Sequence, residues 1–188
     1  MKESISIDEF LRKKILIIGD VGVGKTELTA HIAKTLLKNG YGKDITIIDL
    51  APTRLSDCQR KVGGRITDYI NVDQVKYLTS NFITAPRSTA KSRDELVVMI
   101  VKNRQLIDPL LNEYLGSPTS ILAINDLTMY LHAGKLDKIK RCIFKSETFI
   151  GNAYYGDFLN NDLGTGISAR EKKLTDELCR IMDKVINL

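Results

Sequence analysis

Apolar residues follow two alternating patterns along this chain, short unbroken runs and longer stretches with a helical repeat. The unbroken runs have the length of strands, and strands that are buried on both faces show this pattern. We therefore predict buried strands at residues 14–19, 45–50, 76–84, 120–125 and 147–151.

Helical repeats fill the intervals between these runs. Leu28, Ile32 and Leu36 place an apolar stripe on a predicted helix over 25–38, which Gly40 can end. A short helix is expected at 136–143.

A further helix is predicted from Ser92 or Asp94, either of which can cap its first turn. Asp108-Pro109 is expected to kink or restart this helix, because proline is favoured in a first turn and disfavoured inside.

The helix signal nearest the end of the sequence is the clearest. Ser168 and Glu171 fit a capping box. The apolar stripe that follows consists of Leu174, Leu178, Ile181 and Val185. We therefore predict one helix from Ser168 through Val185.

The alternation of strands and helices predicts an α/β fold with three layers, in which helices cover both faces of a mostly parallel sheet of about five strands. No linker composition or internal repeat divides the sequence, so we predict one domain over residues 1–188. Ligands of such folds gather at the carboxyl ends of the strands.

Composition narrows the class of protein. The 43% hydrophobic and 27% charged residues are typical of a soluble globular protein, and no apolar run has a membrane-spanning length. The acidic first residues do not resemble a signal peptide. Cys58, Cys142 and Cys179 form no CxxC pair, and we expect them to be reduced thiols of a cytoplasmic protein. The net charge of +5 suits a nucleotide, and permits nucleic acid without requiring it.

The segment between the first predicted strand and helix matches G-x-x-x-x-G-K-[ST] in full. It reads Gly19-Asp20-Val21-Gly22-Val23-Gly24-Lys25-Thr26. Glycines let the backbone turn and bring N–H groups to phosphate oxygens, at the positive end of the helix dipole. We expect Lys25 to reach the β- and γ-phosphates and the Thr26 hydroxyl to ligate Mg²⁺. The alternative is a glycine-rich turn that matches by accident.

On these residues the chain resembles the P-loop NTPase superfamily, most strongly over residues 14–38. The apolar run that ends at Asn125-Asp126 is similar to the Walker B motif of that superfamily. The resemblance implies that ATP or GTP binds with Mg²⁺, and that Asp126 holds the same ion as Thr26, directly or through water.

Departures from the family motifs narrow the resemblance. The loop has Asp20 where the ParA and MinD loop has a lysine. Leu127 follows Asp126, so the Asp-Glu pair of AAA+ and RecA-like ATPases is absent. Met129 stands where the D-x-x-G switch of Ras-like GTPases has its glycine, so that motif is absent too. The chain then looks most like the kinase–GTPase division, with the SIMIBI and GPN-loop group as one candidate branch.

In nucleotide kinases and the SIMIBI group, an acid at the end of the second strand faces the γ-phosphate. By that resemblance Asp49 orients a nucleophile or binds metal through water, and the alternative is a turn residue before Pro52. Arg87, in a loop with three cations at 85–93, either clamps a phosphate or belongs to a solvated loop. Arg60, Lys61 and Arg65 form a second basic loop with the same alternatives.

The sequence carries no complete guanine-reading N-K-x-D motif. Asn152 is present, but no lysine follows it and Asp157 is displaced, so ATP is somewhat favoured over GTP. Tyr154 or Tyr155 either stacks on a base or packs in the core.

The leading prediction is a Mg²⁺-dependent NTPase that acts as a switch or assembly factor on a protein partner, with Lys25, Asp49, Arg87 and Asp126 as catalytic candidates. A second is a small-molecule or nucleotide kinase, in which Asp49 and Arg87 bind the acceptor. A third is a nucleic-acid-associated binding protein that is regulated by a bound nucleotide. It rests on the net charge and on a basic cluster that is more often a solvated helix face, namely Lys135, Lys138, Lys140, Arg141 and Lys145.

Overall fold

The computed structural model describes residues 6–52 and 64–188. Its strands are β1 (Lys14–Gly19), β2 (Ile45–Asp49), β3 (Lys76–Thr79), β4 (Ile121–Asn125), β5 (Thr148–Tyr154) and β6 (Lys184–Asn187). They form one six-stranded sheet in the order β3-β2-β4-β5-β1-β6, and every neighbouring pair is parallel. The predicted α/β fold class is confirmed, with one strand more than expected.

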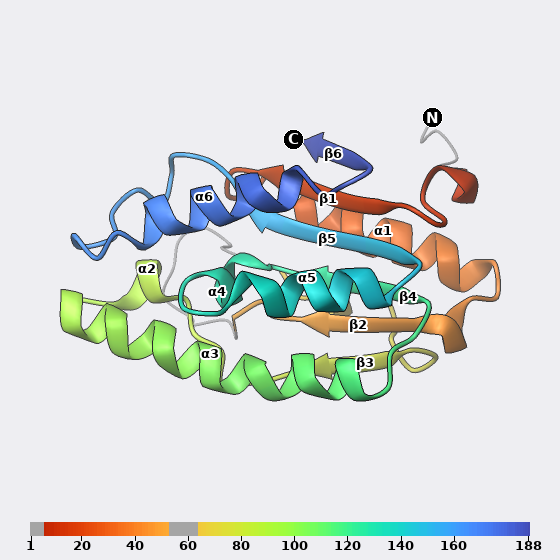
Figure 1. Cartoon of the computed structure of the whole chain (residues 1–188), viewed down its shortest axis with the longest axis horizontal. Helices are drawn as coiled ribbons and strands as arrows, with labels where there is room; N and C mark the ends of the chain where they lie inside the picture. The colour runs from red at the N-terminus through yellow and green to blue at the C-terminus, as the bar shows by residue number, and fades with distance from the viewer. Residues whose placement is uncertain (1–5, 53–63) are drawn as a thin grey trace.

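The helices are α1 (Lys25–Lys38), α2 (Pro86–Thr89), α3 (Arg93–Gly116), α4 (Thr128–Leu131), α5 (Leu136–Lys145) and α6 (Ile167–Cys179), with short 3-10 turns η1 (Ile7–Glu9), η2 (Gly42–Asp44) and η3 (Ile66–Asp68). Figure 1 shows α3, α4, α5 and α6 in front of the sheet and α1 behind it. The sheet is therefore the middle of three layers.

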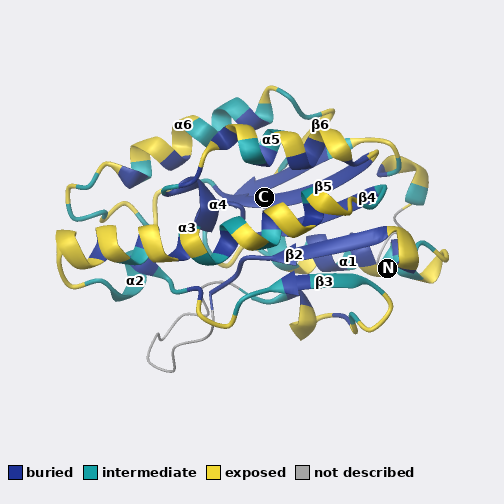
Figure 2. Ribbon diagram, turned by 60° about the horizontal axis from the view of Figure 1, so that its bottom comes forward, coloured by how far each residue is buried: buried dark blue, intermediate teal, exposed yellow. Residues whose placement is uncertain are grey.

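The four central strands, β2, β4, β5 and β1, each contribute to two separate cores, because successive side chains point to opposite faces. In β1, Ile15 and Ile17 pack with Leu36 of α1, whereas Leu16 and Ile18 belong to the core beneath α3 to α6. Strands β1, β2, β4 and β5 are buried on both sides, as their colouring in Figure 2 shows. This double burial explains why they are unbroken apolar runs in the sequence.

The prediction of a helix through Val185 is wrong. Helix α6 ends at Cys179, and residues 184–187 form β6, which pairs with β1. The turn is held by Asp183, whose Oδ2 accepts a hydrogen bond from Lys14 N at 2.6 Å. The free edge of β1 thus supplies backbone hydrogen-bond partners for residues 184–187, and the spacing of apolar residues in the sequence carries no signal of that pairing. Gly19 lies against this strand so closely that a Cβ there would be 2.7 Å from the Leu188 carbonyl oxygen.

The capping box predicted at Ser168 and Glu171 is also wrong. Helix α6 begins at Ile167, and its N-cap is Gly166 with a left-handed φ of 78°. Asp162 takes the capping part, because its Oδ2 accepts from Ser168 N at 3.1 Å. Glu171 is buried instead, with a 2% exposed residue surface.

Helix α3 begins at the predicted cap, because the Ser92 hydroxyl accepts from Glu95 N. It then continues through Pro109 without restarting. Asp108 is not an N-cap, since its carboxylate accepts from Tyr130 at 2.8 Å and from Lys138 at 2.6 Å. These bonds tie the middle of α3 to the helices beside it. No helix in the described ranges is long and apolar enough to cross a membrane.

Candidate functional site

The loop between β1 and α1 has the backbone that its glycines predict. Gly22 and Gly24 have φ values of 78° and 95°, a left-handed conformation that residues with a Cβ adopt at a cost of about 1–2 kcal/mol. Gly24 is the N-cap of α1, and no side chain caps this helix end. The first N–H groups of α1 are therefore directed toward the loop, where they can bind an anion.

Lys25 is folded back onto the loop. Its Nζ donates to the carbonyl oxygen of Gly19 at 2.9 Å and also to that of Asp20. Burial lowers the pKa of this ammonium, while the nearby charges of Asp126, Asp20 and Glu171 oppose the shift. A half-buried cation therefore stands where the motif places phosphate oxygens.

A cavity of about 250 Å³ opens beside this lysine. The phosphate loop with Thr26 lines it, and so do Arg87 of α2, Met129 of α4 and His132, the C-cap of α4. Asp126, which follows the carboxyl end of β4, also lines the cavity. The position agrees with the rule that ligands bind at the carboxyl edge of a parallel sheet.

Beneath the loop lies a buried polar network whose centre is Asn125. Its Oδ1 accepts from the Thr26 hydroxyl at 3.1 Å and from Asn152 Nδ2 at 2.7 Å, and its Nδ2 donates to Asp49 Oδ1 at 2.8 Å. Asn152 also donates to the Thr29 hydroxyl at 2.8 Å, so it joins α1 to the strand ends. Thr26 therefore contacts Asn125, the residue before the predicted acid.

Asp49 lies within this network and is not among the residues that line the cavity. It is completely buried, and its carboxylate accepts from the backbone N–H groups of Ala51 and Ile66, from the Tyr77 hydroxyl and from Asn125. Four donors are as many as the two oxygens of a carboxylate ordinarily take. In this conformation Asp49 holds the loop after β2 in place.

Asp126 is fixed by hydrogen bonds of both its backbone N–H and its side chain. It has a φ of 58°, its N–H donates to Asn152 Oδ1 at 2.9 Å, and its carboxylate accepts from the Thr128 hydroxyl at 2.6 Å. Burial raises the pKa of the Asp126 carboxyl, although the Thr128 hydrogen bond and the Lys25 charge act in the opposite direction. A carboxyl with a raised pKa is the stronger proton acceptor once it is ionised.

Arg87 does not lie in a solvated loop. Its side chain is 3% exposed, and its Nη2 is 2.6 Å from Glu171 Oε2 in an ion pair whose acid is 2% exposed. The guanidinium stacks on the Tyr154 ring at 4.9 Å and donates to the Leu159 carbonyl at 3.2 Å. The ion pair links α2 to α6 at the border of the cavity. Of the other basic loop, Arg60 and Lys61, like Cys58, lie outside the described residues.

Asp20 connects the phosphate loop to the segment after β5. Its Oδ2 accepts from the N–H groups of Asp157 and Phe158 at 3.1 and 3.3 Å, and its Oδ1 accepts from Val21 N at 2.6 Å. Burial alone would raise the pKa of Asp20, but these three backbone hydrogen bonds and the Lys25 charge lower it. The loop residue that departs from the ParA and MinD pattern therefore binds the chain's own backbone.

The tyrosines and Asn152 make protein contacts. Tyr154 lines the cavity but is covered by Arg87, and its hydroxyl accepts from Leu159 N at 2.8 Å. Tyr155 donates to Asp176 at 3.0 Å. Asn152 is 2% exposed, and its amide is occupied by the network described above.

Sequence analysis did not identify Asn125, Asn152, His132 or Glu171 as parts of the site. A signal was present for the first two, because each is a polar residue at the carboxyl end of an otherwise apolar strand, as Asp49 is. His132 and Glu171 had no comparable signal, since only the packing of α4 against α6 brings them together.

No protein-family model matches this chain, and no curated protein sequence matches it. The crystal structure of Pif1 helicase from Candida albicans is similar, with a TM-score of 0.40 and 12% sequence identity. The match covers 94% of this chain and 36% of the helicase chain, so this chain spans about a third of that length. A likeness this distant carries no argument about activity. The parallel sheet between two helical layers is consistent with a P-loop NTPase fold.

Proposed function

We propose that this chain binds a nucleoside triphosphate with Mg²⁺ at the loop Gly19–Thr26 and cleaves or transfers its γ-phosphate. The observation that carries the proposal is the position of Lys25. It is half-buried at the uncapped start of α1, directly after two left-handed glycines, and Asp126 lines the same cavity. A cation and aligned N–H groups are the features that bind a phosphate chain.

The oxygen atoms around the cavity suit Mg²⁺, which prefers oxygen ligands and keeps several waters. The Thr26 hydroxyl and the Asp126 carboxylate would hold the ion, and the contact between Thr26 and Asn125 would orient that hydroxyl. A bound Mg²⁺ would neutralise charge on the β- and γ-phosphates. Lys25 would exchange its two carbonyl contacts for phosphate oxygens.

The remaining catalytic candidates, Asp49 and Arg87, differ in whether they line the cavity. Asp49 is engaged with four protein donors, so we propose that it positions Asn125 and the loop after β2. Arg87 borders the cavity, but its charge is already paired with Glu171. Contact between Arg87 and a phosphate would therefore require that pair to open.

The finer assignments remain predictions. They are a preference for ATP over GTP, the kinase–GTPase division with its SIMIBI branch, a cytoplasmic location and a switch that acts on a protein partner. The support for a nucleic-acid-associated role is weaker, because two lysines of the basic cluster are paired within the protein. Lys138 pairs with Asp108 at 2.6 Å and Lys140 with Glu177 at 3.8 Å.

The test is Lys25→Ala, with Lys34→Ala as the matched control because Lys34 is an exposed lysine of the same helix. Charge-assisted hydrogen bonds contribute about 1.5–3 kcal/mol, so we expect Lys25→Ala to weaken Mg-ATP or Mg-GTP binding roughly 10- to 100-fold. Isothermal titration calorimetry measures the affinity, and circular dichroism checks the fold. Unchanged affinity in folded Lys25→Ala would remove the proposal.

A further inference from the structure

His132 is a buried polar side chain without a hydrogen bond. Its side chain is 0% exposed, and neither ring nitrogen has a hydrogen-bond partner among the described residues. The nearest acidic atom, Glu171 Oε2, is 3.6 Å from Nε2, which is too far for a hydrogen bond. An unsatisfied buried polar group costs about 1–3 kcal/mol, and such a group bordering a cavity calls for a ligand.

The wall around His132 combines polar atoms with an apolar surface. Met129 belongs to α4 and His132 is its C-cap, Pro86 and Arg87 belong to α2, and all four line the cavity that Asp126 also lines. Pockets for small molecules have this composition, in which apolar side chains pack on the carbon skeleton and a few polar groups orient it. The phosphate loop lines the same cavity.

We propose that this wall is a subsite for a small, neutral, hydroxyl-bearing molecule, held by His132 and Asp126 next to the phosphate loop. The inference rests on the proposed function, because the subsite would place a phosphoryl acceptor beside the nucleotide. A neutral imidazole offers one donor and one acceptor, and a hydroxyl offers the complementary pair. A polyol, a sugar or a nucleoside hydroxyl has this chemistry.

The charges of this wall argue against an anionic acceptor. The Arg87 guanidinium is paired with Glu171 at 2.6 Å, so its positive charge is already balanced. Asp126 adds a carboxyl on the same side, and it would repel an anion when ionised. The Lys25 cation is bound to the carbonyl oxygen of Gly19 in the phosphate loop, where the triphosphate would use its charge.

The transfer is balanced by the groups present. The acceptor oxygen would form a bond to the γ-phosphorus, and the bond from that phosphorus to the β,γ-bridging oxygen would break. The leaving nucleoside diphosphate would take the electron pair, and the acceptor's proton would pass to an oxygen of the transferred phosphoryl group.

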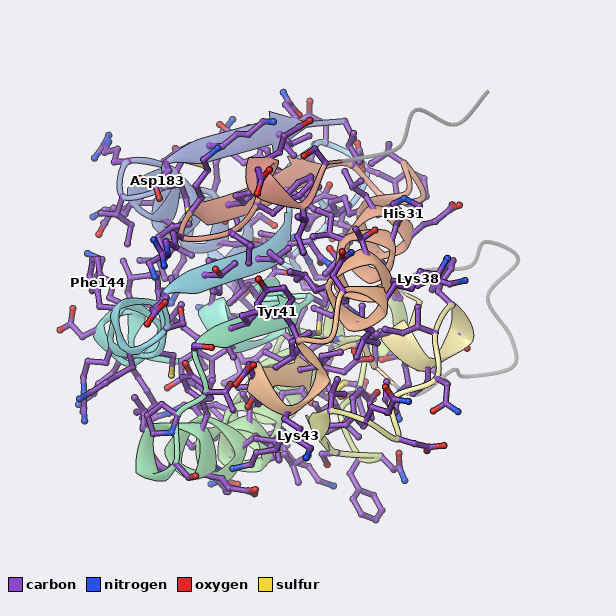
Figure 3. All side chains as sticks on the ribbon, turned by 90° about the vertical axis from the view of Figure 1, so that its right-hand side faces the viewer. His31, Lys38, Tyr41, Lys43, Phe144 and Asp183 are labelled. Carbon is purple, nitrogen blue, oxygen red and sulfur yellow. The ribbon has the colours of Figure 1, made fainter. Side chains whose placement is uncertain are left out.

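The binding test uses the two histidines of the chain, His31 and His132. His31 lies on α1, on the far side of the sheet from α4, and Figure 3 shows it at the outside of that helix. The protein, labelled with ¹⁵N-histidine and saturated with Mg-ADP, is titrated with glycerol, ribose, glucose and uridine. We expect at least one of these compounds to shift the ring-nitrogen signals of His132 and to leave those of His31 unchanged.

Inorganic phosphate and acetate are titrated in parallel as anionic probes. If no neutral probe shifts the His132 signals, or if the anions alone shift them, the proposal is overturned. The spectrum is taken on the unaltered chain, so the test does not depend on whether a variant folds.

The activity test compares His132→Gln with His31→Gln. Loss of one or two hydrogen bonds to the acceptor predicts roughly a 10-fold fall in phosphate-ester formation from Mg-ATP, measured by ³¹P NMR with the compound that shifted His132. Release of free phosphate and affinity for Mg-ADP should change less than about twofold, because the phosphate loop is intact. Equal losses of ester and free phosphate would contradict an acceptor subsite.

The two proposals fail in different ways. Absence of Mg-ADP binding in calorimetry removes the proposed function itself. Intact nucleotide binding, together with unshifted His132 signals or with no ester from any of the four compounds, removes only the acceptor subsite.

Discussion

Asn125 shows what a sequence motif reveals and what it leaves hidden. The spacing of glycines, lysine and threonine predicted the phosphate loop, because that chemistry is local in the chain. Asn125, by contrast, binds Thr26 across 99 positions and Asp49 across 76. Partners at such distances are set by the order of strands, so residue types alone could not identify them.

Asn125→Asp tests whether the network stabilises the fold. The substitution replaces an amide that donates to Asp49 with a carboxylate, so it removes two donated hydrogen bonds and places like charges together. We expect a loss of about 1–3 kcal/mol in the free energy of unfolding. Urea unfolding measures it, and Asn112→Asp, on the exposed side of α3, should change stability by less than about 0.5 kcal/mol. Equal effects would show that Asn125 is not part of a tight network.

Asp126→Asn predicts a dependence on pH. Folding raises the pKa of Asp126 above its ordinary value of 3.8. In the pH window between the unfolded-state pKa and the folded-state pKa, the folded state therefore binds more protons than the unfolded state. The stability of the unaltered protein therefore falls as pH rises through the window, and asparagine cannot contribute to this fall. We expect the variant to gain stability relative to the unaltered chain between about pH 4 and pH 7 in urea unfolding. A constant difference at both pH values would contradict a raised pKa.

At the scale of elements, the sequence predicted where apolar runs and stripes lie, and tertiary partners decided how far each element extends. Helix α3 continues through Pro109, and the Asp108 carboxylate accepts from Tyr130 and Lys138 instead of capping a new helix. The segment at 184–187 fits a helical stripe in sequence but becomes β6, because the open edge of β1 offers backbone hydrogen bonds. Glu171 has the spacing of a cap but lies within a buried ion pair.

Ile186→Ser and Val185→Ser distinguish the strand from the predicted helix. In β6 these neighbours face opposite sides, and Ile186 packs on the core beneath α1 whereas Val185 is 39% exposed. We expect Ile186→Ser to lower the free energy of unfolding by about 1–3 kcal/mol and Val185→Ser by less than about 0.5 kcal/mol. Thermal or urea unfolding of the two variants measures the difference. The reverse order would support the helical stripe.

At the scale of the whole molecule, the parallel sheet brings β1, β2, β4 and β5 to one edge, and the loop, Asp49, Asn125 and Asn152 meet there. This convergence was predictable, because alternating strands and helices leave few other arrangements. The order of the strands was not predictable. Since β5 lies between β1 and β4, the phosphate loop and Asp126 belong to strands that do not touch.

Nucleotide binding should stabilise the whole fold. A ligand at 100 times its dissociation constant adds about 2.7 kcal/mol, and for a chain of this size each kcal/mol raises Tm by about 2–4 °C. We therefore expect Mg-ATP or Mg-GTP to raise Tm by about 5–10 °C, and the preferred base should give the larger shift. Differential scanning fluorimetry measures it with and without Mg²⁺. An unchanged Tm with every nucleotide at millimolar concentration would count against the proposed site.

The place of β1 between β5 and β6 has a consequence for synthesis of the chain. Strand β1 is made before both of its partners, which lie about 130 residues or more further along. At a synthesis rate of about 5–20 residues per second, this apolar strand stays unpaired for on the order of ten seconds before a neighbouring strand is made. Two unpaired edges are prone to wrong pairing during that time. The ribosome must therefore have made the chain through β6 before the loop that begins at Gly19 is held in shape, and a nucleotide can stabilise the nascent chain only after that point.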